Sequence, residues 1–276
     1  MRVVATLTTI PNRIKHIKPI LKSLVKQTRK FDTIYLNIPL KSNKGRKYII
    51  PKDLLDGFPK DLVKIVRCEK DYGPITKLIP TLYHEKDPET CIVIFDDDQL
   101  IHRHVNKILI EKSQKYPNSA LSFSGWCIGV FPFLFQPLKT HKKDIEVDWI
   151  QGSDSIFIKR RFIDINKILD YSGFPVDKFT RNDDHWISHN LDINHINRIK
   201  IDRDATEYFK PSSNTQIEPL SRSIKFIPDI FHISFILKKR GTYKRNAGII
   251  QTFSHRSHFP IFVISLFFII FRTILK

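Results

Sequence analysis

Two kinds of hydrophobic pattern alternate along the first 110 residues of the chain. Runs of consecutive apolar residues, typical of strands buried on both faces, lie at Val3 to Thr8, Thr33 to Ile38, Val63 to Val66 and Ile92 to Phe95. Between them, apolar residues recur every three or four positions, as on one face of a helix: Ile14, Ile17, Ile20, Leu21, Leu24 and Val25; Ile75, Leu78, Ile79 and Leu82; Val105, Ile108 and Leu109. Pro80 weakens the second helix. The alternation predicts an α/β fold with a mostly parallel sheet flanked by helices.

The pattern becomes less regular after about residue 118. Strands are predicted in ALSFSGW and, around a Gly-Ser turn, in IEVDWIQGSDSIFIKRRF; DDHWISHNL opens a short helix and INRIKI is another strand. Beyond Ile201 the chain is polar and rich in Ser, Asn and Pro, which predicts a flexible segment. We therefore expect one domain over residues 1–205, built from halves 1–100 and 101–205. A polar variable segment, 206–256, and an apolar tail, 257–276, follow it.

The net charge and the cysteines indicate which partners and which compartment to expect for the protein. Lys and Arg number 46 against 28 Asp and Glu, a formal net charge of +18. Such a balance indicates a nucleic acid, an anionic membrane surface or a phosphorylated substrate as partner, although a lysine-rich composition bias explains it equally well. The three cysteines are widely spaced and form neither a metal-ligand pattern nor a disulfide framework, which favours a reducing compartment. No secretory signal is expected, because MRVVATLTTIP enters a strand almost at once.

The C-terminal tail is strongly apolar. Its uncharged run from Phe259 to Phe271 covers 13 residues, shorter than the roughly 20 that a membrane-spanning helix needs. With Lys and Arg upstream, the run favours an interfacial or tail anchor; the alternative is a C-terminal helix packed on the domain. Either way, we expect a cytoplasmic protein or one associated with the cytoplasmic side of a membrane.

Candidate chemistry lies in two groups of carboxylates. The apolar strand ending at Phe95 runs directly into Asp96, Asp97 and Asp98, and no cation is adjacent to them in the sequence. Because alternate residues of an extended chain point the same way, Asp96 and Asp98 can converge on one Mg²⁺ or Mn²⁺ ion. A bound diphosphate would complete the coordination shell. The alternative for Asp98 is a solvated strand end.

Several motifs in order carry a resemblance to a known family. A buried strand ending in Asp-Xaa-Asp, together with TLTTIPNRI, CEKDYGPITKL and RNDDHWISHNL, resembles the GT-A-fold glycosyltransferases over roughly residues 1 to 200. The chain is most similar to small glycosyltransferases of large DNA viruses, which act in the infected host cell, and to related bacterial sugar transferases. This resemblance implies a GT-A-like catalytic domain over 1–205, with 1–100 binding the nucleotide and 101–205 the acceptor. It also implies a metal-dependent, inverting transfer from a UDP- or GDP-sugar to a glycan, lipid or protein acceptor.

The resemblance assigns roles to individual residues. It gives Thr8 and Arg13 to the nucleotide pocket, Asp71 to the base or ribose, Lys77 to the diphosphate, Asp96 to the ribose or to the metal through water, and Asp98 to the metal directly. Asp97 would point away from the metal and cap the next element. Alternative interpretations remain: Arg13 as a surface charge at a helix start, Lys77 as an exposed helical lysine, and Asp71 as the residue that begins the turn before Gly73-Pro74.

The resemblance also implies that an Asp of the late acidic motif is the catalytic base. A sugar hydroxyl is a poor nucleophile at neutral pH and needs such a base. Of Asp183 and Asp184 we choose Asp184, and we expect Asp183 to cap the helix that follows, because a carboxylate bound to backbone amides has a lowered pKa. The resemblance further implies a third metal ligand, for which His185, His232, His255 and His258 are candidates. Trp149 and Gly152 resemble the segment that faces the donor sugar and acceptor, although a core position suits Trp149 equally well.

Two other classes of function compete with this interpretation. In a two-metal nucleic-acid enzyme or basic nucleic-acid binder, the acidic clusters would hold two metals and the basic surface would hold phosphates. The sequence carries no recognisable nucleic-acid motif, which disfavours that class. A membrane-associated protein with a degenerate, inactive fold would bind no nucleotide in a metal-dependent way.

Overall fold

The computed structural model describes residues 1–128, 135–137, 142–172 and 183–218. The chain divides into two compact units, Met1–Gly125 with Leu138–Ser223, and Trp126–Pro137 with Ile224–Lys276. In the second unit, the described residues of β7 (Gly125–Ile128) pair antiparallel with β8 (Phe135–Pro137). All candidate site residues that the structure describes lie in the first unit.

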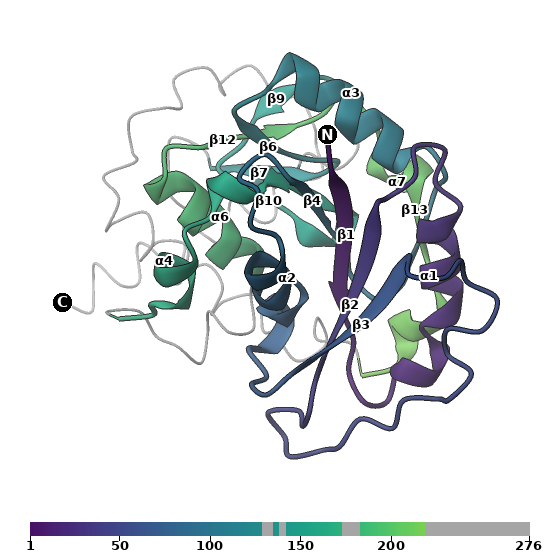
Figure 1. Cartoon of the computed structure of the whole chain (residues 1–276). Helices are drawn as coiled ribbons and strands as arrows, with labels where there is room; N and C mark the ends of the chain where they lie inside the picture. The colour runs from purple at the N-terminus through teal and green to yellow at the C-terminus, as the bar shows by residue number, and fades with distance from the viewer. Residues whose placement is uncertain (129–134, 138–141, 173–182, 219–276) are drawn as a thin grey trace, which may run out of the picture. The chain divides into compact units, whose positions relative to one another are not determined.

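An eight-stranded sheet forms the centre of the first unit (Figure 1), in the order β3-β2-β1-β4-β11-β6-β12-β9. Its strands are β1 (Val3–Thr8), β2 (Thr33–Pro39), β3 (Val63–Cys68), β4 (Cys91–Ile94), β6 (Ser119–Ser122), β9 (Ile145–Glu146), β11 (Ile156–Lys159) and β12 (Asn197–Lys200). The first four strands are mutually parallel, as the alternation predicts, whereas β11 runs antiparallel to both of its neighbours. The short strand β10 (Trp149–Ile150) precedes the turn that leads into β11. The predicted α/β class with a mostly parallel sheet is confirmed.

Helices cover both faces of the parallel half. Val3, Ala5 and Leu7 of β1 belong to the core that η1 (Ile14–His16), α1 (Lys18–Val25) and α3 (Val105–Lys115) complete on one face. Thr6 faces the other way, toward η2 (Gly73–Lys77) and α2 (Ile79–His84), and Figure 1 shows α1 and α2 on opposite sides of the strands. Pro80 lies in the first turn of α2, where its missing N–H costs no helical hydrogen bond.

Residues 101–205 add short elements around one longer helix. These are η3 (Gly152–Asp154), η4 (Arg160–Phe162), α4 (Ile165–Leu169) and α6 (Asp183–Ile193). Trp186 of α6 is buried and donates its indole N–H to the carbonyl of Ile168, 2.8 Å away. This contact packs α6 on α4 and fixes the helix whose first turn carries Asp183 and Asp184.

Residues 205–218 differ from the flexible segment expected beyond Ile201. They form α7 (Ala205–Tyr208), β13 (Phe209–Pro211) and η5 (Ser213–Gln216), and β13 pairs antiparallel with β5 (Gln99–Ile101). An aromatic contact attaches this segment to the core, because Phe209 is buried with its ring centroid 5.1 Å from that of Phe123. Two aromatic residues, Tyr208 and Phe209, are enough to attach an otherwise polar stretch to the core.

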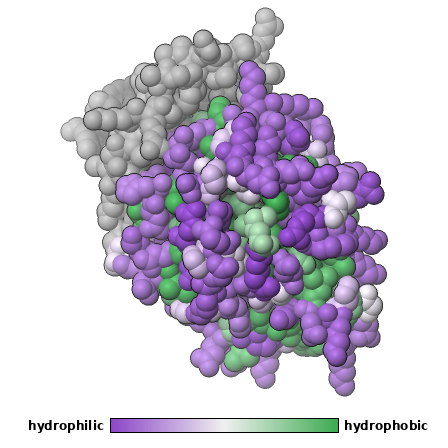
Figure 2. Space-filling model, turned by 45° about the horizontal axis from the view of Figure 1, so that its top comes forward, coloured by the Kyte–Doolittle hydropathy of each residue, from purple (hydrophilic) through white to green (hydrophobic). Residues whose placement is uncertain are grey.

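None of the helices within the described ranges is both long and apolar enough to cross a bilayer, and the tail 257–276 lies outside those ranges. The face in Figure 2 is mostly hydrophilic, with apolar residues in small groups between polar ones.

Candidate active site

The candidate site lies where the central strands end. Asp96, Asp97 and Asp98 follow β4, Lys77 is the last residue of η2, and Asp183 and Asp184 begin α6. Ligands of open α/β sheets bind outside the carboxyl ends of the strands. The fold therefore brings together the two carboxylate groups, which are far apart in the sequence.

Lys77 is the cation that joins these groups. Its Nζ lies 2.5 Å from Oδ1 of Asp96 and 2.6 Å from Oδ2 of Asp183, and its side chain is only 4% exposed. Burial alone lowers the pKa of a lysine, but the carboxylates of Asp183, Asp96 and Asp184 outweigh it and hold the pKa of Lys77 well above its ordinary value. Lys77 is thus a permanently charged, buried ammonium group rather than an exposed helical lysine.

A buried polar network holds the backbone of Lys77. Its carbonyl accepts hydrogen bonds from the hydroxyl of Thr6 and, at 2.9 Å, from Nδ2 of Asn37. The same Nδ2 reaches the hydroxyl of Thr81 at 3.1 Å, and all three partners are fully buried. Sequence reasoning missed these residues, although Thr6 and Asn37 are polar positions inside apolar strands. Such an interruption is a signal, because a buried polar group needs a partner.

Gly152 lies directly beside the carboxylate of Asp184. Its backbone N–H donates to that carboxylate, and a Cβ on Gly152 would lie less than 3.0 Å from Oδ1 of Asp184 and 3.5 Å from Nζ of Lys77. Burial, followed by repulsion from Asp183, raises the pKa of Asp184 well above its usual range despite Lys77. Asp184 is therefore a more basic carboxylate than one at the surface.

Asp183 has a different partner from the one expected. As a helix cap it would accept backbone amides, whereas the structure aims its carboxylate at the Lys77 ammonium. Burial raises the pKa of Asp183, and the ion pair with Lys77, which stabilises the ionised carboxylate, opposes that rise without cancelling it. The two adjacent acids therefore have different contacts from those expected. Asp183 pairs with Lys77, and Asp184 accepts from the Gly152 amide.

Asp97 is buried, and its carboxylate is held by Arg13 and Thr9. Its carboxylate accepts from Nη1 of Arg13 at 2.6 Å and from the Thr9 hydroxyl at 2.5 Å. It was expected to cap the next element, but it forms a buried ion pair instead. Arg13, expected in the nucleotide pocket, is 6% exposed and also donates Nε to the carbonyl of Ile217 at 2.6 Å. These contacts give Arg13 a structural role in the turn formed by residues 96–98, which we name the Asp turn.

The negative charges of neighbouring carboxylates affect the pKa of Asp98. Burial, then repulsion from Asp96 and Asp97, raises its pKa to about 6, although Arg13 lies 3.7 Å from Oδ2. The carboxylates of Asp96, Asp183 and Asp184 act on the Lys77 ammonium, while the Arg13 guanidinium is the nearer cation to Asp98. Asp96 and Asp98 have side chains 31% and 27% exposed, so a hard divalent cation can reach them. Asp96 and Asp98 thus offer the hard carboxylate oxygens that Mg²⁺ or Mn²⁺ prefers, and no third such side chain joins them within the described residues.

Two other assigned residues have local partners. The Thr8 hydroxyl donates to the Asn37 carbonyl at 2.7 Å. Asp71 accepts from the backbone N–H groups of Asn43, at 2.7 Å, and Gly73, at 2.8 Å. This is the turn geometry that the alternative interpretation of Asp71 predicted.

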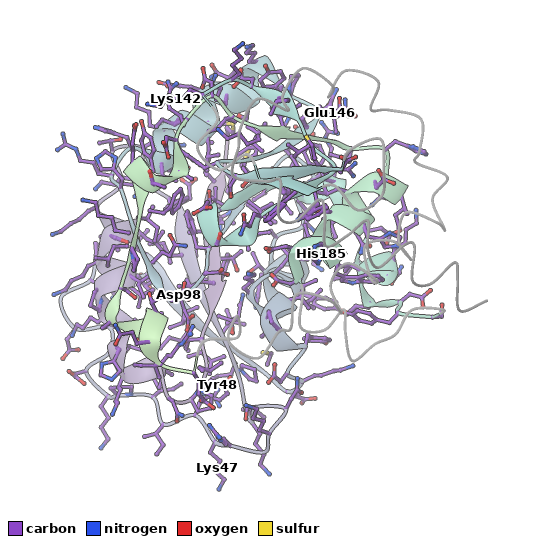
Figure 3. All side chains as sticks on the ribbon, turned by 180° about the vertical axis from the view of Figure 1, so that it is seen from behind. Lys47, Tyr48, Asp98, Lys142, Glu146 and His185 are labelled. Carbon is purple, nitrogen blue, oxygen red and sulfur yellow. The ribbon has the colours of Figure 1, made fainter. Side chains whose placement is uncertain are left out.

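Two aromatic residues, Trp149 and His185, contact each other, and His185 directly follows Asp184 in the chain. Trp149 is buried, and its ring centroid lies 5.1 Å from that of His185 in an edge-to-face arrangement. Figure 3 labels His185 on α6 and Asp98 beyond the end of β4. Within the described ranges, no cluster of three or more His, Cys, Asp or Glu residues is arranged to hold a metal. His232, His255 and His258 lie outside those ranges.

Comparison with known proteins gives a likeness in fold. No protein-family model and no curated sequence matches the chain. A crystal structure of S. aureus TarS matches with a TM-score of 0.53 at 13% identity, over 95% of this chain and 47% of TarS. TarS 1–349 gives 0.54 with UDP at 13% identity and 0.54 with UDP-GlcNAc at 14%, each over 87% of this chain and 66% of TarS 1–349. The chain spans between about half and two thirds of these structures. It therefore has a GT-A-like α/β fold, similar to that of a protein that binds UDP and UDP-GlcNAc.

Proposed function

We propose that this chain is a metal-dependent, inverting glycosyltransferase that moves a sugar from a nucleotide-sugar donor to a glycan, lipid or protein acceptor. The observation that carries the proposal is the Lys77 ammonium, buried between Asp96 of the Asp turn and Asp183 of α6. A fixed cation beside a basic carboxylate is what the two halves of a glycosyl transfer need. The fold shared with TarS, which binds UDP and UDP-GlcNAc, supports a UDP-sugar as donor.

Asp184 is the proposed general base. It takes the proton of the acceptor hydroxyl as that oxygen bonds to the anomeric carbon of the donor sugar. The bond between that carbon and the diphosphate breaks in the same displacement, which inverts the configuration. The raised pKa of Asp184 suits this task, because a base works best when its pKa approaches the working pH. The Gly152 N–H keeps the carboxylate oriented.

Lys77 is the proposed partner of the departing nucleoside diphosphate. The network of Thr6, Asn37 and Thr81 holds the backbone of Lys77. Asp96 and Asp183 hold its ammonium in place before negative charge develops on the leaving group. Asp96 and Asp98 would hold a divalent cation. That ion would neutralise the diphosphate as a Lewis acid.

The remaining assignments complete the proposed donor site. Thr8 is the last residue of β1 and Asp71 follows β3, at the same edge of the sheet as the Asp turn, and we assign both to the nucleotide. Arg13 would act on the nucleotide only through Asp97 and Asp98, since its guanidinium is committed to them. We retain a cytoplasmic or membrane-associated location, with the tail 257–276 as the anchor, as part of the proposal.

A thermal-shift screen of the full chain tests this function. UDP and GDP, with and without Mn²⁺, are compared with ATP and a short oligonucleotide, because a ligand that binds the native state raises the apparent stability. We expect UDP to raise Tm only when Mn²⁺ is present. A shift produced by the oligonucleotide alone would refute the proposal in favour of nucleic-acid binding, and the absence of any shift would indicate an inactive fold.

A further inference from the structure

The Asp turn has no regular secondary structure of its own, yet its backbone is held at several points. The contacts come from residues 212–217, which we name the clamp. The backbone N–H of Ser212 and the hydroxyl of Thr215 both donate to the carbonyl of Asp98, at 2.9 and 2.8 Å. Nδ2 of Asn214 donates to the carbonyl of Asp97 at 2.8 Å. In Figure 3 the light-green end of the described chain runs beside Asp98.

A second set of contacts ties the clamp to the opposite side of the turn. Arg13 donates to the Asp97 carboxylate through Nη1 and to the Ile217 carbonyl through Nε, each at 2.6 Å. Its guanidinium therefore links the loop after β1, the Asp turn and the clamp. The pairing of β13 with β5 continues the attachment, since Pro211 lies opposite Gln99.

These contacts are selective. The two backbone carbonyls and the Asp97 side chain are all occupied, while the carboxylates of Asp96 and Asp98 keep 31% and 27% of their surface exposed. Repulsion between the three carboxylates favours a turn in which they lie farther apart. The clamp opposes this change, because it holds the backbone carbonyls of Asp97 and Asp98. A divalent ion needs its oxygen ligands close to fixed positions. Contacts that orient ligands typically matter by 10–100-fold in metal affinity.

We propose that the clamp positions Asp96 and Asp98 for the donor-bound divalent ion, with Asn214 as its central positioning residue. The inference rests on the proposed function. It makes residues 212–217 part of the donor site, although they contribute no group to the chemistry. It also gives Arg13 and Asp97 the same purpose, because their ion pair connects the turn to the clamp.

The chain offers a matched control for Asn214. Asn106 is also fully buried, and its Nδ2 donates to one backbone carbonyl, that of Arg29, at 2.7 Å. Asn106 lies in α3, on a different part of the core from the Asp turn. Asn214→Ala and Asn106→Ala therefore remove the same kind of contact, one at the turn and one elsewhere.

The experiment measures the affinity of the full chain for Mn²⁺ in saturating UDP, from the electron paramagnetic resonance signal of free Mn²⁺. Asn214→Ala should weaken Mn²⁺ binding about 10–100-fold, whereas Asn106→Ala should stay close to wild type. Hydrogen exchange should accelerate in the amides of residues 96–99 in Asn214→Ala and not in Asn106→Ala. Equal Mn²⁺ affinity in both variants, with unchanged exchange at the turn, would overturn the inference.

Thr215 gives a second pair in case Asn214→Ala fails to fold. Thr215→Val removes the hydroxyl that donates to Asp98 and should weaken Mn²⁺ binding, while Thr215→Ser keeps it and should restore the affinity. Equal affinity of these two variants would count against the clamp. A wild-type chain that binds no Mn²⁺ with UDP would overturn the proposed function and the clamp together. A wild type that binds normally, beside variants that also bind normally, would overturn the clamp alone.

Discussion

Gly152→Ala adds a single carbon where the structure has no room for one. The new Cβ would lie less than 3.0 Å from Oδ1 of Asp184, 3.3 Å from its Cγ and 3.5 Å from Nζ of Lys77. Carbon and oxygen normally stay about 3.5 Å apart, so the Asp184 carboxylate must move by roughly 1 Å. The Gly152 N–H then no longer meets the carboxylate as it does in the wild type.

The magnitude follows from that displacement. A misplacement of about 1 Å can cost on the order of 100-fold in rate. Sugar transfer, measured as the rate at which UDP is released from the UDP-sugar donor, should therefore fall by about that factor. Donor affinity should change little, because a general base acts in the transition state. Overpacking should also lower the free energy of unfolding by about 1–3 kcal/mol, which leaves a folded protein to measure.

The assay compares Gly152→Ala, Asp184→Asn and the double variant. If the added carbon acts through Asp184, the double variant should be no slower than Asp184→Asn alone. Ser153→Ala is the control, because it lies in the same turn and adds no atom. Wild-type rates in Gly152→Ala, or independent losses that multiply in the double variant, would refute the link between Gly152 and Asp184.

Three other outcomes are expected. Asp184→Asn should reduce turnover about 10²–10⁴-fold with donor Kd nearly unchanged; the same loss in Asp183→Asn but not in Asp184→Asn would move the base. Because burial and its neighbours raise the pKa of Asp98 from 3.8 to about 6, the folded metal-free chain binds that proton more tightly than the unfolded chain. Its stability should fall by up to about 3 kcal/mol as pH rises from about 4 to above 6. Asp98→Asn should therefore melt higher than wild type at pH 7.5 but not at pH 4, and should gain nothing from Mn²⁺ with UDP; equal melting at pH 7.5 would contradict the charge argument. Removing residues 257–276 should release the chain from anionic vesicles without changing UDP release, and an insoluble product would identify the tail as core.

The first half of the fold was predictable because three of its four strands, β1, β2 and β4, are buried along almost their whole length. β1 begins and ends where the apolar run does, and the other three strands differ from their runs by one or two residues. The helical pattern over 14–25 predicted the buried face correctly but not the break into η1 and α1. Pro19 accounts for that break, since it lies in the first turn of α1. The antiparallel insertion of β11 between β4 and β6 was missed, because an apolar pattern does not specify strand partners.

The acidic residues of the site were predictable from the sequence, but the residues that contact them were not. Runs of Asp are visible in a sequence, whereas the cation that makes them tolerable is Lys77, which lies 19 residues before Asp96. The clamp was missed for a related reason. Its residues are the Ser, Asn and Thr that usually indicate a flexible segment, and they become structural only because Phe209 anchors the strand before them.

The clamp also sets when the site can exist during synthesis of the chain. Asn214 and the Asp97 carbonyl are 117 residues apart, and Arg13 reaches Ile217 across 204 residues. A ribosome that has made the whole parallel half of the sheet has made the three aspartates but none of the contacts that restrain their backbone. Contacts of such long sequence separation form late in folding. We therefore expect nascent chains that end before residue 217 to lack the contacts that restrain the acidic turn, and we expect the proposed donor binding to begin only after the clamp has left the ribosome.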